Sequence, residues 1–517
     1  MPIKKIPSET GNAALDLALD TINIGKQALV FANTKRSAEK TAEDIAHKLK
    51  INNEKLDELS NEVLKALSRP TKQCERLAKC VKKGIAFHHA GLVAKQRELV
   101  EDNFRNGTIK IICSTPSLAM GVDLPAFRAI LKDLRRYGAN GLNYIPVLEY
   151  LQMSGRAGRP KFDSFGEAIC VASSDNDKDK LHEMYILGEP EEIYSKLAVE
   201  PVLRTYLLSL IAANFVNSKK QITDFFGKTF WAFQFVDMNK LVSIIDKMLD
   251  LLEEWEFIER SGKKEFSDAN KLDDEKIKAT LIGKRVAELY IDPLTAYFFI
   301  TCLRNASDKK VNEISFLQMI SHTLEIRPLL RVSAKDEENI QEHLLKMSDF
   351  LLEDEPSLYD MEYEDFVNSI KTSLMMHEWV NEKDEEYLME NFNVRPGELR
   401  GKLDIADWLL YASEEMSRML QYQYLNKEIV KLRLRLRYGV KEELLSLIRL
   451  QDIGRVRARK LFANRIRDIK DIKNTDISIL ADILGKQVAL SIKKQVGQET
   501  IPVKEGKRKG QISLEDY

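Results

Sequence analysis

The sequence lacks three features that would each define a class of protein. Its 517 residues include five cysteines but no C-x-x-C pair, so neither a zinc site nor a disulfide framework is predicted. No apolar run approaches the roughly 20 residues that cross a bilayer, and the N-terminal MPIKKIPSET has no signal-peptide core, so a cytoplasmic protein is expected. No G-x-x-x-x-G-K-[ST] phosphate loop occurs, because FGKTF at Gly227 has neither the upstream glycine nor a preceding strand.

The charges are segregated along the chain although they nearly cancel, leaving a net charge of -1. Lys431 to Lys473 contains 14 basic and 5 acidic residues, whereas Lys335 to Phe366 contains 12 acidic residues and 2 lysines. The basic excess suits a nucleic-acid phosphate backbone. The alternative is a solvated helical surface that the acidic stretch balances.

The first part of the chain alternates between strand and helix patterns. QALVFANT, GIAFHHAGL, TIKIICSTPS and GEAICVASS are short apolar runs typical of strands buried on both faces, and amphipathic helical patterns separate them. This alternation predicts an α/β domain with a parallel sheet over residues 1–192. Ligands bind beyond the carboxyl ends of such strands, which is where ANTKRS, HHAGL and STPSLAMGVDLP fall.

After Pro201 the pattern becomes mainly helical. Three helical patterns and FIERSGKKEF, interpreted as two strands about a Ser-Gly turn, predict a winged helix over residues 193–288. Residues 289–430 are predicted to be helical. KLRLRLRYGV alternates with a period of two, as strands do, but its helical surroundings argue against a strand.

Four loops resemble, in their order and spacing, the second RecA-like domain of superfamily 2 helicases: VFANTKRSAEK, FHHAGL, STPSLAMGVDLPA and QMSGRAGRP. The whole chain resembles the archaeal DNA repair helicases of the Hjm type, relatives of the helicase half of polymerase theta. The resemblance implies five parts: a second RecA-like domain (1–192), the winged helix (193–288), a helical ratchet domain (289–430), a helix-hairpin-helix module (431–500) and a disordered tail (501–517). It also implies that the first RecA-like domain is not in this chain.

The resemblance implies that QMSGRAGRP faces ATP. Arg156 and Arg159 match the arginines that stabilise charge on the transferred γ-phosphoryl group, and Gln152 is expected to sense that phosphate or its water. Gly121 and Asp123 match the nucleotide side of STPSLAMGVDLPA. The alternative is a surface helix start with solvated arginines. ATP and Mg²⁺ are the expected cofactors, bound mainly by the first RecA-like domain, and no metal site is expected in this chain.

The same loops imply contacts with the nucleic-acid backbone. Thr34 and the hydroxyls of Ser114 and Thr115 are expected to face it, with a backbone contact to DNA near His89. A histidine pair is more often structural than catalytic. The expected partners are single-stranded and forked DNA.

Two further segments match DNA-handling parts of the family. AILKDLRRYGANGLNYIPVLEY is predicted to form a hairpin, which matches the wedge that splits the duplex, and Tyr137 and Tyr144 flank its tip and could stack on a base pair. A hairpin that only caps the sheet is the alternative. The helix that carries Arg400 and Trp408 matches the ratchet helix, although a Trp in a long helix is more often part of a core.

LLSLIRLQDIGRVRARKLFANRIRDI resembles a helix-hairpin-helix module. Its turn at Gly454 is expected to aim backbone N–H groups at a phosphate, and Val456 stands where a second glycine is usual. Four basic side chains surround the turn: Arg455, Arg457, Arg459 and Lys460. Binding of the DNA backbone without base readout is predicted.

The tail ends in QISLEDY, which resembles the peptide by which replication proteins bind the sliding clamp. Gln511 is expected to enter a polar pocket, while Leu514 and Tyr517 share one side of a helical turn and enter an apolar groove. A frayed terminus without a partner is the alternative.

The expected function is that of the C-terminal portion of an ATP-dependent 3′ to 5′ DNA helicase acting on forks and junctions in replication-coupled repair and recombination. The alternative is a non-catalytic DNA-binding protein derived from a helicase that lost its first motor domain.

Overall fold

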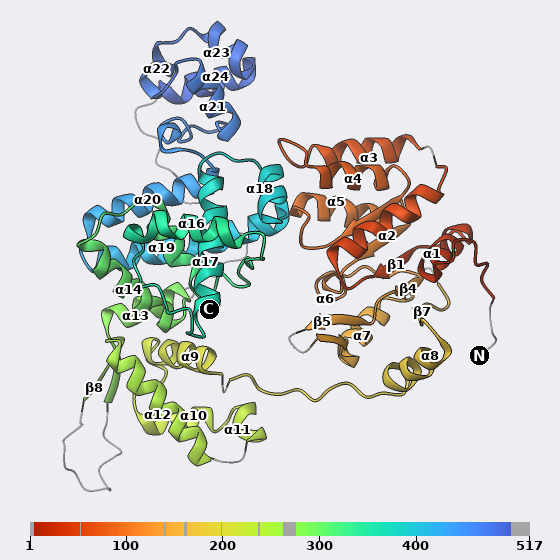
Figure 1. Cartoon of the computed structure of the whole chain (residues 1–517), viewed down its shortest axis with the longest axis horizontal. Helices are drawn as coiled ribbons and strands as arrows, with labels where there is room; N and C mark the ends of the chain where they lie inside the picture. Colours follow the sequence, from red (N-terminus) through yellow and green to blue (C-terminus); the bar gives the residue numbers. More distant parts are fainter. Residues whose placement is uncertain are drawn as a thin grey trace. The chain divides into compact units, whose positions relative to one another are not determined.

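The computed structural model describes residues 5–51, 53–138, 141–159, 163–197, 199–235, 238–261 and 276–497, which form two units (Figure 1). The first unit comprises Met1–Val202, Thr223–Ile245 and Glu385–Lys402. The second comprises Leu203–Ile222, Asp246–Asp384 and Leu403–Tyr517. The domain boundaries drawn from the sequence stay predictions.

The first unit is built around a parallel sheet with the strand order β2-β3-β1-β4-β7. Its strands are β1 (Ala28–Phe31), β2 (Ile85–His88), β3 (Ile111–Ser114), β4 (Arg128–Leu131) and β7 (Glu167–Cys170). Every residue of β1, β2 and β3 is buried, which explains why their sequences are apolar runs rather than alternating patterns. The predicted parallel α/β domain is confirmed.

Helices surround this sheet. They are α1 (Ala13–Asn23), α2 (Lys35–Lys48), α3 (Glu54–Leu64), α4 (Lys72–Val81), α5 (Ala94–Arg105), α6 (Ser117–Gly121), α7 (Val147–Ser154) and α8 (Asp175–Leu181). Helices α2, α4 and α5 pack on β2, while α1 and α7 pack on β4. Helix α2 starts after Thr34 because that hydroxyl accepts a hydrogen bond from the N–H of Ser37, 3.0 Å away.

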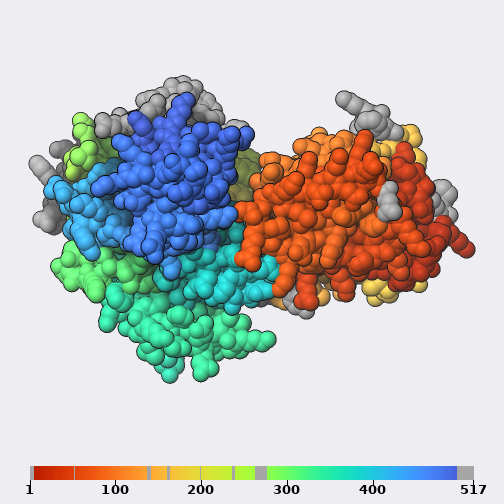
Figure 2. Space-filling view, turned by 90° about the horizontal axis from the view of Figure 1, so that it is seen from above, coloured from red at the N-terminus to blue at the C-terminus, as the bar shows by residue number. Residues whose placement is uncertain are grey.

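A segment far along the sequence belongs to the same unit. Helix α18 (Glu385–Phe392) and the start of α19 (Pro396–Met419) lie against the helices of the sheet, and the cyan surface near residue 400 meets the orange-red surface in Figure 2. The ion pairs of Lys35 with Glu398 and of Lys72 with Glu390 join the two. Sequence patterns assigned this segment to the helical half.

The predicted hairpin is present, but its first arm differs from the expected one. The run AIL lies in β4 of the main sheet, where the buried Arg128 side chain is paired with Asp20 and Glu167. The hairpin is formed by β5 (Arg135–Gly138) and β6 (Gly141–Tyr144). Two turn-forming glycines therefore face each other at the end of a short two-stranded ribbon.

The remaining elements from α9 to α20 are mainly helices. They are α9 (Glu200–Ala212), α10 (Lys219–Phe226), α11 (Phe230–Gln234), α12 (Met238–Glu254), β8 (Ile258–Ser261), β9 (Lys276–Ala279), α13 (Leu281–Leu289), α14 (Pro293–Ser307), α15 (Glu313–Ser321), α16 (Glu337–Met347), α17 (Tyr363–Val380) and α20 (Gln423–Tyr438). No single helix of the described residues is long and apolar enough to cross a membrane, although the bent pair α13 and α14 passes that test together.

The short hairpin in this region differs from the predicted one. Strand β8 pairs with β9, so that Ser261 lies opposite Lys276 and the strands do not reverse at a Ser-Gly turn. The residues directly after the expected turn are charged, whereas β9 supplies Ile277, which is buried. The winged helix itself stays a prediction.

The first eight residues of KLRLRLRYGV form the end of α20, so the helical surroundings predicted their state correctly. Four apolar side chains of this helix are buried at helical spacing: Leu425, Ile429, Leu432 and Leu436. After α20, the chain forms α21 (Arg455–Ala463), α22 (Ile469–Asn474), α23 (Ile477–Leu484) and α24 (Lys486–Val496). These helices share an apolar core of their own, as a separate module requires.

Candidate nucleotide and DNA interfaces

The loop that carries the two arginines is fixed to the segment before β4. The N–H of Ala126 donates to the carbonyl of Arg156 (2.9 Å), and the N–H of Gly158 donates to the carbonyl of Ala126 (2.6 Å). Gly158 has a φ of +96°, and a Cβ on Gly166 would lie 2.2 Å from the Gly158 nitrogen. Both glycines are therefore needed for the close approach, which presents Arg156 and Arg159 from a rigid loop.

The structure brings two predicted nucleotide-side residues, Arg156 and Asp123, together. The Nε of Arg156 donates to the carbonyl of Ala119 (3.2 Å), and Nη1 lies 3.4 Å from Oδ1 of Asp123. The Asp123 side chain is 93% exposed, and Gly121 is exposed at the end of α6. Gln152 is exposed on α7, which ends directly before the arginine loop. These groups form an accessible polar surface.

Arg159 is held by a second set of groups. Its Nη1 donates to Oε1 of Gln27 (2.6 Å), and its Nε donates to Oδ2 of Asp163 (2.7 Å). The hydrogen bond from Arg159 holds the pKa of Asp163 below its ordinary value, and Lys26, 2.7 Å away, acts in the same direction. A phosphate that approaches Arg159 would compete with this carboxylate for the guanidinium.

A pocket of about 550 Å³ lies at the carboxyl ends of β1 and β3. It is lined by Asn33, Thr34, Lys35, Arg36, Ala90, Thr115, Ser117, Asn393 and Arg395. No lining residue is acidic, and the Thr115 and Ser117 hydroxyls are 2.9 Å apart. Hydroxyl, amide and cationic donors together suit a phosphate group. The pocket brings Thr34 and Thr115 together, as expected, whereas sequence patterns missed Asn393 and Arg395.

The structure does not place the side chains of Ser114 and His89 at the surface. Ser114 ends the buried strand β3 and is fully buried, so its hydroxyl is not exposed, and its expected DNA contact stays a prediction. His89 is also fully buried; its Nδ1 accepts from the N–H of Gly91 (3.1 Å), so Nε2 carries the proton donated to Glu39 (3.1 Å). Burial lowers the pKa of His89, which keeps the ring neutral. A backbone contact near it stays a prediction.

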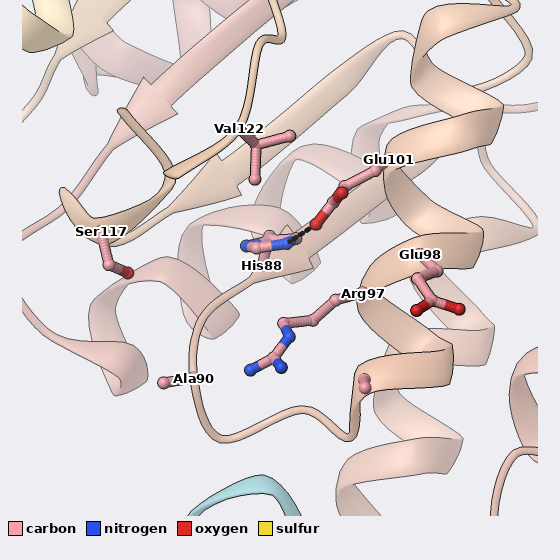
Figure 3. A pocket seen from close by; sticks show the side chains of 8 residues that line it. His88, Ala90, Arg97, Glu98, Glu101, Ser117 and Val122 are labelled. Atoms are coloured by element: carbon pink, nitrogen blue, oxygen red, sulfur yellow. Dashed lines mark hydrogen bonds and ion pairs between the residues drawn. The ribbon is translucent and has the colours of Figure 1, made fainter. Parts of the chain in front are cut away.

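A second pocket of about 390 Å³ shares Ala90 and Ser117 with the first (Figure 3). His88 lies in it with Nε2 2.8 Å from Glu101, and its Nδ1 is buried without a hydrogen-bond partner among the described residues. Arg97 and two glutamates also line this pocket. Because its charges are mixed, it suits a phosphate less well than the first pocket does.

The hairpin places its aromatic residues differently from the prediction. Tyr144 lies at the base of the hairpin, opposite Arg135, whose guanidinium lies 4.4 Å from the centre of the tyrosine ring. Its hydroxyl donates to Asp177 (3.2 Å), so this ring is engaged within the unit. The Tyr137 side chain lies outside the described residues. Leu142 is 51% exposed near the tip, and sequence reasoning missed it although it is the only large apolar residue between Gly138 and Asn143.

The two ratchet-helix residues both lie on α19. Nη2 of Arg400 is 3.4 Å from Glu385, and the Arg400 side chain is about half exposed. Trp408 is partly buried, and its indole N–H donates to the carbonyl of Leu289 (3.0 Å) at the end of α13. Carbonyls at helix ends lack helical partners, so Trp408 has a structural role. Its expected DNA contact stays a prediction.

Two of the four predicted helix-hairpin-helix residues are engaged with other side chains. Arg459 forms ion pairs with Glu382 and with Glu443 (2.7 Å for the latter). The Arg455 guanidinium lies 4.9 Å from the centre of the Trp379 ring. Both groups therefore help to hold the second unit together.

Arg457 and Lys460, the other two predicted residues, are exposed, as a DNA contact requires. Arg457 is exposed and donates to the carbonyl of Asp452 (2.7 Å), and Lys460 is exposed on α21. The clamp-binding residues Gln511, Leu514 and Tyr517 lie outside the described residues. In the described part of the chain, no group of three or more His, Cys, Asp and Glu side chains is placed to hold a metal ion.

Two family models and several relatives are similar to this chain. The helicase conserved C-terminal domain matches residues 63–161, and domain 4 of archaeal helicases matches residues 314–439. The ATP-dependent DNA helicase Hel308 of Methanococcus vannielii is 37% identical over 96% of this chain and 70% of its own length. The Hel308 proteins of Pyrococcus horikoshii (37% identical) and Methanocella arvoryzae (38%) match 98% and 96% of this chain, and 68% and 67% of their own lengths. This chain belongs to the Hel308 family of ATP-dependent DNA helicases.

Proposed function

We propose that this chain is the C-terminal portion of a 3′ to 5′ DNA helicase that acts on forks and junctions in replication-coupled repair and recombination. The observation that carries the proposal is the loop that presents Arg159, and Arg156 beside Asp123, in a sequence without a phosphate loop. A RecA-like domain that supplies these arginines but no phosphate loop contributes only one half of a nucleotide site. The other half, with the main ATP and Mg²⁺ contacts, belongs to a separate RecA-like domain.

The phosphate-suited pocket supports a DNA track on the same unit. Thr34 and Thr115 contact the strand backbone there, which fixes its position without reading its sequence. The hairpin β5–β6 is the wedge, and α19 is the ratchet helix that follows the strand. The winged helix, the helix-hairpin-helix module and the kinship with the helicase half of polymerase theta are parts of this proposal.

Reconstitution tests the proposal against the alternative of a non-catalytic DNA-binding protein. The chain is mixed with the RecA-like domain that carries the phosphate loop of a Hel308 relative, and DNA-stimulated ATP hydrolysis is measured. Restored hydrolysis supports the helicase. DNA binding without hydrolysis, in a mixture where the two proteins co-purify, supports the alternative.

Lys460→Ala and Arg459→Ala are expected to act on different properties. Lys460 is exposed, so its loss should weaken DNA binding and reduce the slope of log K against log salt by about 1, with an unchanged melting temperature. Arg459→Ala should instead destabilise the chain by roughly 1 kcal/mol, because Glu382 and Glu443 lose a partner. Fluorescence anisotropy and thermal melting measure both. An unchanged salt slope for Lys460→Ala would contradict the DNA-binding module.

The tail is proposed to bind the sliding clamp through Gln511, Leu514 and Tyr517. Titration calorimetry of the peptide 504–517 into the cognate clamp is expected to give a micromolar affinity, about -8 kcal/mol. Most of this should vanish with Leu514→Ala plus Tyr517→Ala, because those side chains supply the apolar contact. No heat at hundreds of micromolar peptide would leave the tail without this partner.

A further inference from the structure

Residues 385–402, called the elbow here, are bound to helices α2 and α4 and to the loop after β2 in the first unit. The N–H of Lys72 donates to Glu386 (3.0 Å), and the Lys72 ammonium is paired with Glu386 and Glu390 on α18. Lys35 and Glu398 form a second ion pair, at the start of α19. The bonds of Lys72 place α18 beside the start of α4. The elbow therefore belongs to the surface that carries the phosphate-suited pocket.

Two glycines allow the elbow to approach this closely. The N–H of Gly397 donates to the carbonyl of Gly91 (2.9 Å). A Cβ on Gly397 would lie 2.2 Å from the carbonyl oxygen of Leu92 and 2.4 Å from that of Ala90. These obstacles are backbone atoms, which cannot turn aside as a flexible side chain can. The position of the elbow thus depends on the absence of a side chain at Gly397.

A buried carboxylate orients the Arg395 side chain. Glu39 is 2% exposed and accepts hydrogen bonds from His89 (3.1 Å), Gln73 (3.0 Å) and the Nε of Arg395 (3.1 Å), while Arg76 is paired with its second oxygen. Burial alone would raise the pKa of Glu39, but these hydrogen bonds and the charge of Arg395 hold it well below its usual range. The carboxylate is therefore ionised and holds one edge of the guanidinium.

The rest of the Arg395 guanidinium is available to a ligand. Within the described part of the chain, only its Nε has a hydrogen-bond partner, and the residue lines the pocket opposite no acidic side chain. Burial lowers the pKa of Lys35, which lines the same pocket, and the charge of Arg395 adds to that effect. Lys35 is already paired with Glu398, so a phosphate in this pocket would be held mainly by the remaining N–H groups of Arg395.

We propose that Arg395 contacts a phosphate of the bound DNA strand in this pocket, and that Glu39 and Gly397 are the positioning residues that hold it there. The inference rests on the proposed function, since it needs a strand in the pocket. The elbow would then supply a phosphate contact in addition to those proposed for Thr34 and Thr115. The Arg395 guanidinium is planar and charged, and its N–H groups can donate hydrogen bonds to phosphate oxygens.

The test measures binding of the whole chain to fluorescein-labelled oligothymidylate at several salt concentrations. Arg395→Gln is expected to weaken binding about tenfold at low salt and to reduce the slope of log K against log salt by about 0.7, the value for one phosphate on a single strand. Arg395→Lys should keep the slope while losing part of the affinity. Loss of folded protein changes the active fraction and not the slope, so the slope separates a contact from a structural role.

The positioning role has a matched control on the same helix. Gly397→Ala should reduce the slope as Arg395→Gln does, whereas Gly401→Ala should not, because a Cβ at Gly401 meets no atom within 4 Å. An unchanged slope for Arg395→Gln overturns the inference, and identical slopes for the two glycine variants overturn the role of Gly397. If Gly397→Ala does not fold, the Arg395 variants still decide the contact. Failure of the unmodified chain to bind the oligonucleotide would overturn the proposed DNA track itself.

Discussion

Arg156→Ala and Arg159→Ala are each expected to lower DNA-stimulated ATP hydrolysis about 10³-fold when the chain is combined with a RecA-like domain that carries a phosphate loop. This loss corresponds to about 4 kcal/mol of transition-state stabilisation. The physical reason is that each guanidinium supplies fixed positive charge where negative charge accumulates on the transferred group. Steady-state phosphate release with saturating single-stranded DNA measures it.

Two controls separate this role from a general loss of charge or structure. Arg105→Ala removes an exposed arginine paired with Asp102 on α5, and hydrolysis should not change. Arg159→Lys keeps the charge but loses the fork that reaches Gln27 and Asp163 together, so it should recover only a small part of the activity. Without the added domain, no hydrolysis above background is expected. If this chain alone hydrolysed ATP in a DNA-stimulated reaction that Arg159→Ala abolishes, the proposal that a separate domain supplies half of the ATP site would be wrong.

Replacement of Gly138 to Asn143 by a two-residue turn is expected to abolish strand separation in the reconstituted enzyme while DNA-stimulated ATP hydrolysis stays within about twofold. The structural reason is that the hairpin β5–β6 is a two-stranded ribbon outside the main sheet, so its tip can be removed without disturbing β4. A forked duplex with a fluorophore and quencher measures separation.

Single substitutions refine the same experiment. Leu142→Ser should lower unwinding because it removes the exposed apolar side chain near the tip. Tyr144→Phe is the matched control: it loses only the hydroxyl bonded to Asp177 at the hairpin base, so unwinding should persist. Unwinding that survives removal of the tip would show that the hairpin only caps the sheet.

The sequence was informative where local patterns coincide with local structure. The apolar runs identified β1, β2 and β3, since strands covered on both faces need no polar positions. The run GEAICVASS also marked β7, but this edge strand is only partly buried. KLRLRLRYGV alternates as a strand does, but its helical surroundings predicted its state. Ile429 and Leu432 are both buried on one face of α20, whereas in a strand residues three apart would point to opposite faces. Gly138 and Gly141 predicted the position of the hairpin tip, because glycine is favoured in tight turns.

Some of the predicted site residues are exposed and others are buried, because exposure depends on the packed fold. The sequence correctly placed Thr34 and Thr115 at strand ends, and Asp123, which it assigned to the nucleotide side, lies beside Arg156. It could not show that Ser114, one residue before Thr115, is buried. Nor could it show that Arg459, two residues after Arg457, is engaged by Glu382 and Glu443.

By itself, the sequence determined the parallel sheet and the order of the motif loops, because these follow from residue type and spacing along the chain. Only the tertiary structure decided that the elbow joins the sheet and that Arg395 completes the pocket. Glu39 and Arg395 lie far apart in the sequence, and no local pattern links them. Their meeting depends on a glycine at position 397, whose missing side chain lets two distant backbones touch.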